Sequence, residues 1–196
     1  RTRQTGRNPG TLRPANLRPL TMNAKNPKGF RPHTFASLVK KPVHFFAFGL
    51  GSGLIHPAPG TWGTIAATIL YYPLSFLLTG PITTAIFLLT TFAIGCWLCD
   101  KTSHDLGVHD FGEIVWDEFV GVWIVLAYLP PALWQRWGIL PCYLAAFLLF
   151  RVFDIAKPPP IRQIDRRTPG GFGIMLDDVL AAIYALIPLW LIAAII

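Results

Sequence analysis

The sequence predicts an all-α integral membrane protein, a polytopic helical bundle with four to five transmembrane helices. Hydrophobic residues make up 53% of the 196 residues and charged residues only 14%, whereas soluble domains carry about 25% charged residues. The apolar residues also occur in long runs, and short stretches between these runs hold nearly all the charge. This alternation is typical of membrane proteins.

Five apolar runs approach the roughly 20 residues that a helix needs to cross a hydrocarbon core of about 30 Å. They are residues 62–79, 81–99, 119–135, 138–153 and 179–196. We expect Pro130 and Pro131 to end or kink the third helix near Leu129, because proline lacks an amide N–H and its ring clashes with the preceding turn. The stretch 43–55 is apolar but Gly-rich and too short to span alone.

The distribution of Lys and Arg predicts the orientation. Ten of the seventeen lie in residues 1–44, and the positive-inside rule assigns such a segment to the cytoplasmic side. Alternation of the spans then brings 100–118 and 154–178 to the same side. Arg136 is left as the only charged residue of the opposite side.

The net charge of +7 has two interpretations, nucleic-acid binding and attraction to anionic lipid headgroups. The positive charge flanks the spans and no nucleic-acid motif is present, so we expect membrane lipids and no nucleic acid as partners. Residues 1–42, rich in Arg, Pro, Asn and Thr, are expected to form a disordered basic tail. A membrane-embedded domain then covers 43–196.

All ten acidic residues lie between Asp100 and Asp178, on the predicted cytoplasmic side. The stretch GEIVWDEFVG, residues 112–121, brings Glu113 and Asp117 one turn apart on one helix face. Acids in a first turn favour the helix dipole, which explains one or two of them without any function. The others would repel one another unless a cation neutralises them, so the pattern predicts a cation site at the membrane boundary.

Two further polar stretches belong to the same predicted side. GLGSGLIHPAPGTWGT, residues 49–64, is Gly-rich, and its backbone amides could approach an anion closely. Its threonines Thr61 and Thr64 are candidates for substrate binding or for capping the next helix. In 150–178, basic residues and a glycine turn suit a phosphate, and an acidic pair suits a hard cation. Both stretches are also consistent with ordinary connecting loops.

Mg²⁺ is the expected cation, because it prefers oxygen ligands and shares its coordination with substrate phosphates. The histidines of the acidic loops lack a zinc-binding pattern. Cys96 and Cys99 form a CxxC, but inside an apolar run this favours packing over redox chemistry or zinc binding. The predicted metal ligands are acids from three separate stretches: Asp117, Glu118, Asp154, Asp177 and Asp178.

Four motifs occur in an order known from one family: PGTWGT, HDFGEIVWDEFVG, FRVFDIAKPPPI and GGFGIMLDD. In these motifs, and over roughly residues 40–196, the chain resembles the phosphatidylglycerophosphatase A family. The resemblance implies a small bacterial membrane phosphatase that uses Mg²⁺ to remove the terminal phosphate of phosphatidylglycerophosphate, leaving phosphatidylglycerol. It implies a multi-pass protein of the inner membrane, with its active site on the cytoplasmic side.

The resemblance also implies site residues: Asp110, Glu113, Asp117, Glu118, Asp154, Lys157, Asp177 and Asp178. We predict that Asp110 or Glu113 orients the attacking water as a general base. Asp154 and Lys157 are predicted to act in catalysis, Lys157 by holding phosphate oxygens. The candidates for substrate binding are hydroxyl, basic and glycine residues near the motifs: Thr61, Thr64, Lys157, Arg162, Gly171 and Gly173.

Other functions and mechanisms fit parts of the sequence. A divalent-cation transporter would explain boundary carboxylates and proline-broken helices, but the middles of the predicted spans contain no acid. A CDP-alcohol phosphotransferase also clusters aspartates at a membrane face, but its DGxxAR…GxxxDxxxD spacing is absent. No DxDx[TV] or SRxxxxxH pattern indicates a covalent phosphatase, so direct attack by water is preferred.

Overall fold

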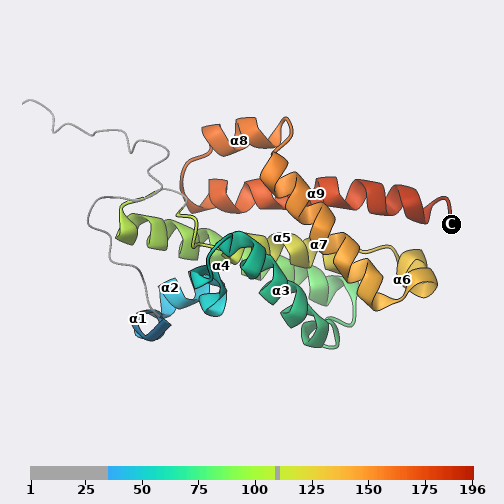
Figure 1. Ribbon diagram of the computed structural model, residues 1–196, viewed down its shortest axis with the longest axis horizontal. Coiled ribbons are helices and arrows are strands. Elements are labelled where there is room, and N and C mark those ends of the chain that lie inside the picture. The colour runs from blue at the N-terminus through green and yellow to red at the C-terminus, as the bar shows by residue number, and fades with distance from the viewer. Residues whose placement is uncertain (1–34, 109–110) are drawn as a thin grey trace, which may run out of the picture.

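The computed structural model describes residues 35–108 and 111–196, apart from the side chain of Arg166, and this part of the chain contains helices without β-strands (Figure 1). The helices are α1 (Phe35–Val39), α2 (Pro42–Ala47), the 3₁₀-helix η1 (Gly49–Leu54), α3 (Pro59–Ser75), α4 (Pro81–Leu106), α5 (Trp116–Ala127), α6 (Pro131–Trp137), α7 (Ile139–Ala156), α8 (Ile161–Arg167) and α9 (Gly170–Ala193). The all-α prediction is confirmed.

Three helices, α4, α7 and α9, are long and apolar enough to cross a membrane; they have 26, 18 and 24 residues. At a rise of about 1.5 Å per residue, even the shortest reaches about 27 Å, close to the roughly 30 Å of a hydrocarbon core. These helices contain the predicted run 81–99 and most of the runs 138–153 and 179–196. The described residues therefore include three candidate membrane spans.

The other two predicted runs form shorter helices. α3 has 17 residues and α5 only 12. α5 ends at Ala127, and after the break Pro131 opens α6, because the paired prolines cannot continue a helix. The predicted break near Leu129 is thus confirmed, and the run 119–135 does not form one continuous helix. The count of four to five spans stays a prediction.

The short helix α5 forms the centre of the bundle, where it packs against α3, α4, α7 and α9. Its middle residues are buried, and Trp123 donates a hydrogen bond from Nε1 to the carbonyl oxygen of Ala67 in α3, at 2.9 Å. A Cβ atom at Gly121 would lie 2.5 Å from a ring carbon of Phe150 in α7. Contact on all sides explains why this segment is apolar around its whole circumference.

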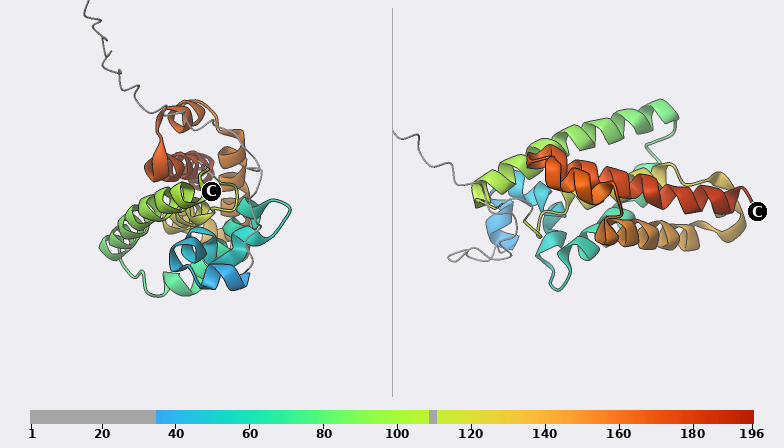
Figure 2. Two further views of the ribbon diagram at one scale, coloured as in Figure 1. Left: turned by 90° about the vertical axis from the view of Figure 1, so that its left-hand side faces the viewer. Right: turned by 90° about the horizontal axis from the view of Figure 1, so that it is seen from above.

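Five helix ends gather at one end of the bundle, away from the C-terminus of the chain (Figures 1 and 2). They are the N-termini of α3, α5 and α9 and the C-termini of α4 and α7. We call this region the polar end, because ion pairs between these helices are found there. The polar stretches that are predicted to share one face of the membrane are therefore close together in space.

The N-terminal helices pack beside the polar end. α2 contacts α4, and η1 contacts α3. Leu38 and Phe48 are fully buried, and the Val115 N–H donates to the carbonyl oxygen of Ala47 at 2.9 Å. Of the predicted tail 1–42, residues 1–34 lie outside the described part, and 35–42 form α1 and the start of α2.

The glycines of the GGFGIMLDD motif allow close packing. A Cβ atom at Gly171 would lie 1.9 Å from the carbonyl oxygen of Cys96 in α4, and one at Gly173 would lie 1.8 Å from that of Thr168. The sequence suggests a glycine turn here, but Gly171 and Gly173 belong to the first turn of α9. Gly170, the first residue of α9, has the positive φ of a glycine turn, at 78°, whereas Gly171 and Gly173 bring α9 against its neighbours.

Candidate active site

Three carboxylates from two helices lie together at the polar end. Asp117 and Glu118 belong to the first turn of α5, and Asp178 belongs to α9. One carboxylate oxygen of each lies within 4.8 Å of the others. Asp117 is 8% exposed and Asp178 3%, so this carboxylate cluster is largely shielded from solvent.

The packing of α5 against α9 brings the carboxylate cluster together. Gly121 lies one turn after Asp117, and a Cβ atom at this glycine would lie 3.3 Å from the Cβ of Asp178. The absence of a side chain therefore lets α9 approach the first turn of α5. The N-terminal dipole of α5 favours its own two acids, but it does not account for the third acid, which comes from α9.

The carboxylate cluster has unused ligand atoms. Glu118 Oε2 and Asp178 Oδ2 are buried and have no hydrogen-bond partner in residues 35–108 and 111–196. Burying an ionised group without a partner costs several kcal/mol. A hard divalent cation removes this cost, because carboxylate oxygens are its preferred ligands. The cluster contains oxygen donors only, which favours Mg²⁺ over zinc.

Arg151, near the C-terminus of α7, borders the carboxylate cluster. Its Nη1 donates to Asp154 Oδ2 at 2.5 Å and lies 3.4 Å from Glu118 Oε1. The Arg151 side chain is 14% exposed, and its buried Nε has no acceptor in the described part of the chain. Asp154, a predicted metal ligand, therefore faces a guanidinium group.

Lys157 and Asp177 form a second ion pair beside the carboxylate cluster. Lys157 Nζ also lies 3.2 Å from Asp165 Oδ2 of α8. Lys157 ends α7 in the left-handed conformation, with φ 42° and ψ 62°, which residues with a side chain adopt less readily than glycine. This backbone turn directs the lysine toward α9. Asp177, like Asp154, is therefore a predicted metal ligand that is paired with a basic side chain.

Glu113 precedes α5 and lies 3.2 Å, Oε1 to Nε2, from His56. Burial raises the pKa of the Glu113 carboxyl above its ordinary value, although the hydrogen bond with His56 opposes the shift. A raised pKa suits a group that accepts a proton near neutral pH. Asp110, the other predicted base, lies outside the described residues.

The predicted substrate-binding residues are spread more widely. Thr64 is buried and donates from Oγ1 to the carbonyl oxygen of Gly60 at 2.8 Å, so it is an interior helix residue and does not cap α3. Thr61 is half-buried in the first turn of α3. Arg162 is exposed and donates to the carbonyl oxygen of Ala156 at 3.4 Å.

The amide of the predicted substrate-binding glycine Gly171 donates to Asp100 Oδ1 at 3.2 Å. Gly173 packs against Thr168. Both glycines therefore have structural partners, and phosphate binding by their amides stays a prediction.

Gly60, in the PGTWGT motif, is in close contact with the site. A Cβ atom at this position would lie 2.1 Å from Glu118 Oε1 and 3.2 Å from both terminal nitrogens of Arg151. Any other residue would push the Glu118 carboxylate away. The motif therefore brings the N-terminus of α3 directly against the carboxylate cluster.

Of the five predicted metal ligands, the structure brings three into one cluster, Asp117, Glu118 and Asp178. The sequence interpretation missed Arg151. The available signal was a single cation inside the apolar run 138–153, three residues before Asp154. A charge within a predicted span is a candidate functional residue.

Comparison with known proteins agrees with the motifs. The family model of phosphatidylglycerophosphatase A matches residues 45–193. The Haemophilus influenzae phosphatidylglycerophosphatase A is 60% identical over 146 residues, which cover 74% of this chain and 85% of that protein. The Escherichia coli protein of the same name is 44% identical over 145 residues, 74% of this chain and 80% of that protein.

A third relative, from Bacteroides thetaiotaomicron, carries phosphatidylinositol-3-phosphatase as a provisional name; it is 42% identical over 143 residues, 71% of this chain and 86% of that protein. No solved structure matches the chain. The family match includes every residue of the carboxylate cluster and both cations beside it. The chain belongs to the phosphatidylglycerophosphatase A family.

Proposed function

We propose that the protein hydrolyses the terminal phosphate of phosphatidylglycerophosphate, giving phosphatidylglycerol and inorganic phosphate, in a reaction that requires Mg²⁺. Two relatives that cover most of the chain carry the corresponding name. The observation that carries the chemistry is the buried cluster of Asp117, Glu118 and Asp178, which has unused carboxylate oxygens.

Asp117, Glu118 and Asp178 are the proposed ligands of the cation. A bound Mg²⁺ supplies positive charge that stabilises the negative charge developing on the phosphate oxygens. Asp154 and Asp177 hold Arg151 and Lys157 by ion pairs. We therefore assign these two aspartates to positioning the cations beside the cluster.

Arg151 and Lys157 are the proposed ligands of the phosphate. Guanidinium and ammonium groups bind phosphate oxygens by charge-assisted hydrogen bonds. The N-terminus of α3 lies against the same region through Gly60 and adds N–H donors and a favourable dipole. These groups hold the phosphorus in line between the attacking water and the departing glycerol oxygen.

Glu113 is the proposed general base. It accepts a proton from water while the water oxygen attacks phosphorus, and the phosphorus–oxygen bond to the glycerol headgroup breaks. The departing oxygen takes up a proton to become the hydroxyl of phosphatidylglycerol. The burial that raises the pKa of Glu113 supports this role, and Asp110 is the alternative base.

The polar end is proposed to lie at the cytoplasmic face of the bacterial inner membrane. The Lys and Arg residues of 1–44 support this orientation. The reactive phosphate then lies at headgroup level, while α4, α7 and α9 cross the bilayer. With α3 and α5–α6 inserted beside them, the count reaches the predicted four to five membrane segments.

The test is release of inorganic phosphate from phosphatidylglycerophosphate by purified protein in detergent, with Mg²⁺ and then with excess chelator. We expect release that stops with the chelator and resumes when Mg²⁺ is restored. Folded protein that releases no phosphate in any of these conditions would contradict the proposal. Cation flux into liposomes would then test the transporter alternative.

Gly60→Ala should leave the protein folded but reduce hydrolysis at least about tenfold, since even small displacements in a catalytic site are costly. The new Cβ overlaps the end of the Glu118 side chain, which can rotate away from the carboxylate cluster. Gly80→Ala is the matched control, because Gly80 lies outside the site motifs and the nearest described atom to a Cβ there, Thr83 Oγ1, is 3.9 Å away. Equal activity of the two variants would show that the close contact between Gly60 and Glu118 is not needed for hydrolysis.

Lys157→Ala should raise the KM for the lipid phosphate or lower kcat, because a phosphate ligand and the partner of Asp177 are lost. Lys101→Ala is the charge-matched control, since Lys101 pairs with Asp105 on α4. Steady-state kinetics of both variants gives the comparison. If the two changes had the same small effect, the contribution of Lys157 would be limited to net charge.

A further inference from the structure

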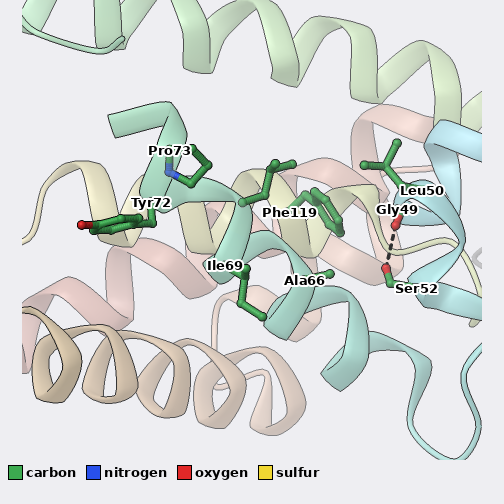
Figure 3. A pocket seen from close by; sticks show the side chains of 9 residues that line it. Gly49, Leu50, Ser52, Ala66, Ile69, Tyr72, Pro73 and Phe119 are labelled. Carbon is green, nitrogen blue, oxygen red and sulfur yellow. Dashed lines mark hydrogen bonds between the residues drawn. The ribbon is translucent and has the colours of Figure 1, made fainter. Parts of the chain in front are cut away.

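An apolar groove runs along α3 (Figure 3). It has a volume of about 700 Å³. Its lining includes Leu50 and Ser52 of η1, Ala66, Ile69 and Pro73 of α3, and Phe119 of α5. The Ser52 hydroxyl donates to the carbonyl oxygen of Gly49 at 2.7 Å, so the groove offers an incoming molecule almost only hydrocarbon surface.

Helix α3 joins this groove to the carboxylate cluster. Gly60 in its first turn abuts Glu118, and Ala66 and Pro73 follow six and thirteen residues later. At about 1.5 Å per residue they lie roughly 9 and 20 Å further along the helix axis. Phe119, which forms the inner wall, directly follows Glu118 in the sequence.

The distance of the groove from Gly60 along α3 is similar to the thickness of one half of a bilayer. Half of a hydrocarbon core of roughly 30 Å is about 15 Å, which falls between the positions of Ala66 and Pro73. A lipid whose phosphate lies at the carboxylate cluster extends its acyl chains in this direction. Binding an acyl chain there hides apolar side chains such as Ile69, which is 68% exposed.

The size of the groove favours a chain molecule over a protein partner. Small-ligand sites have volumes of about 300–1,000 Å³, and this groove falls within that range. A docked helix, about 10 Å across, needs a longer and wider apolar face. We propose that the groove binds one acyl chain of the lipid that is dephosphorylated at the carboxylate cluster, an inference that rests on the function proposed above.

The proposed binding of an acyl chain in the groove is tested by kinetics with two substrates that differ in chain length. Wild-type protein and Ala66→Phe are compared on phosphatidylglycerophosphate with long acyl chains and with six-carbon chains. The ratio of kcat/KM for the long over the short substrate should fall about tenfold in Ala66→Phe, because a filled apolar pocket discriminates by this order. Ala93→Phe, at an exposed position on α4, is the control and should keep the wild-type ratio.

Ile69→Trp is a second variant in case Ala66→Phe does not fold, since Ile69 points outward into the groove. The same fall in the ratio is expected. If the wild type hydrolyses both substrates and Ile69→Trp keeps the wild-type ratio of kcat/KM, the groove does not bind an acyl chain. The proposed function would then remain intact. If the wild-type protein hydrolyses neither substrate, the proposed function itself is wrong.

Photocrosslinking measures where the acyl chain of the lipid binds, independently of hydrolysis. Phosphatidylglycerophosphate with a diazirine in one acyl chain is bound in vesicles with Mg²⁺ to Glu113→Gln protein, which lacks the proposed base and should hydrolyse it slowly, but keeps the proposed ligands of the cation and of the phosphate. Labelling should map to residues 50–73 and exceed labelling by phosphatidylcholine with the same diazirine chain. Equal labelling by the two lipids, or labelling that avoids residues 50–73, would overturn the proposal.

Discussion

Asp178→Asn is expected to lower hydrolysis at least about 100-fold and, without divalent cations, to raise the unfolding temperature. Asp178 shares a buried space with Asp117 and Glu118, within 4.8 Å. Without a cation these carboxylates repel one another, and a neutral amide relieves the repulsion. The gain should be roughly 2–4 °C for each kcal/mol relieved.

Mg²⁺ should stabilise the wild type but not Asp178→Asn. At about 100 times its Kd, the cation adds about 2.7 kcal/mol to the stability of a protein that binds it only when folded. We expect this rise in the wild type and its loss in Asp178→Asn. Asp105→Asn is the control for the response to Mg²⁺, because Asp105 lies at the polar end but pairs with Lys101 and His44.

Thermal unfolding in detergent, with and without Mg²⁺, measures both effects. A variant with the wild-type response to Mg²⁺ and wild-type activity would remove Asp178 from the site. A variant that responds to Mg²⁺ but is inactive would keep Asp178 in catalysis and assign the cation to other ligands.

Arg151→Ala is expected to lower hydrolysis at least about 100-fold and to destabilise the protein by about 3 kcal/mol. Its side chain lies between Glu118 and Asp154 and is 14% exposed. Removing it leaves two shielded carboxylates without their cation. Arg151→Lys should be more stable than Arg151→Ala but still impaired, because an ammonium group lacks the planar set of donors with which a guanidinium group binds two phosphate oxygens at once.

A double variant separates stability from catalysis. Adding Asp154→Asn to Arg151→Ala removes one of the unpaired charges, so the unfolding temperature should partly recover while hydrolysis stays low. Arg136→Ala, in the last turn of α6, is the control and should resemble the wild type. Recovery of hydrolysis together with stability would assign Arg151 a structural role only.

Much of the fold follows from local features of the sequence. Apolar runs with few charges form α4, α7 and α9, because a helix satisfies its backbone hydrogen bonds internally. The paired prolines end α5 two residues before the predicted position at Leu129. The acids and cations of the motifs likewise gather at one end, because α3, α4, α5, α7 and α9 each have one terminus at the polar end of the bundle.

The details of the site depend on packing between helices. Five acids are equally plausible metal ligands in the sequence, and only the approach of α9 to Gly121 selects Asp178 rather than Asp177 for the carboxylate cluster. Gly171 and Gly60 resemble residues of phosphate-binding loops until their contacts with Cys96 and Glu118 are known. Arg151 is a single charge within the apolar run 138–153, and the sequence alone does not show that it lies between Glu118 and Asp154.

The most direct test of the central claim is electron paramagnetic resonance with Mn²⁺ in place of Mg²⁺ and a non-hydrolysable phosphonate analogue of the lipid. We expect one class of bound Mn²⁺ with a phosphorus hyperfine coupling in the wild type, and loss of this coupling in a protein carrying Asp117→Asn and Asp178→Asn. Bound Mn²⁺ whose phosphorus coupling survives in that variant would contradict the claim that the carboxylate cluster brings cation and lipid phosphate together.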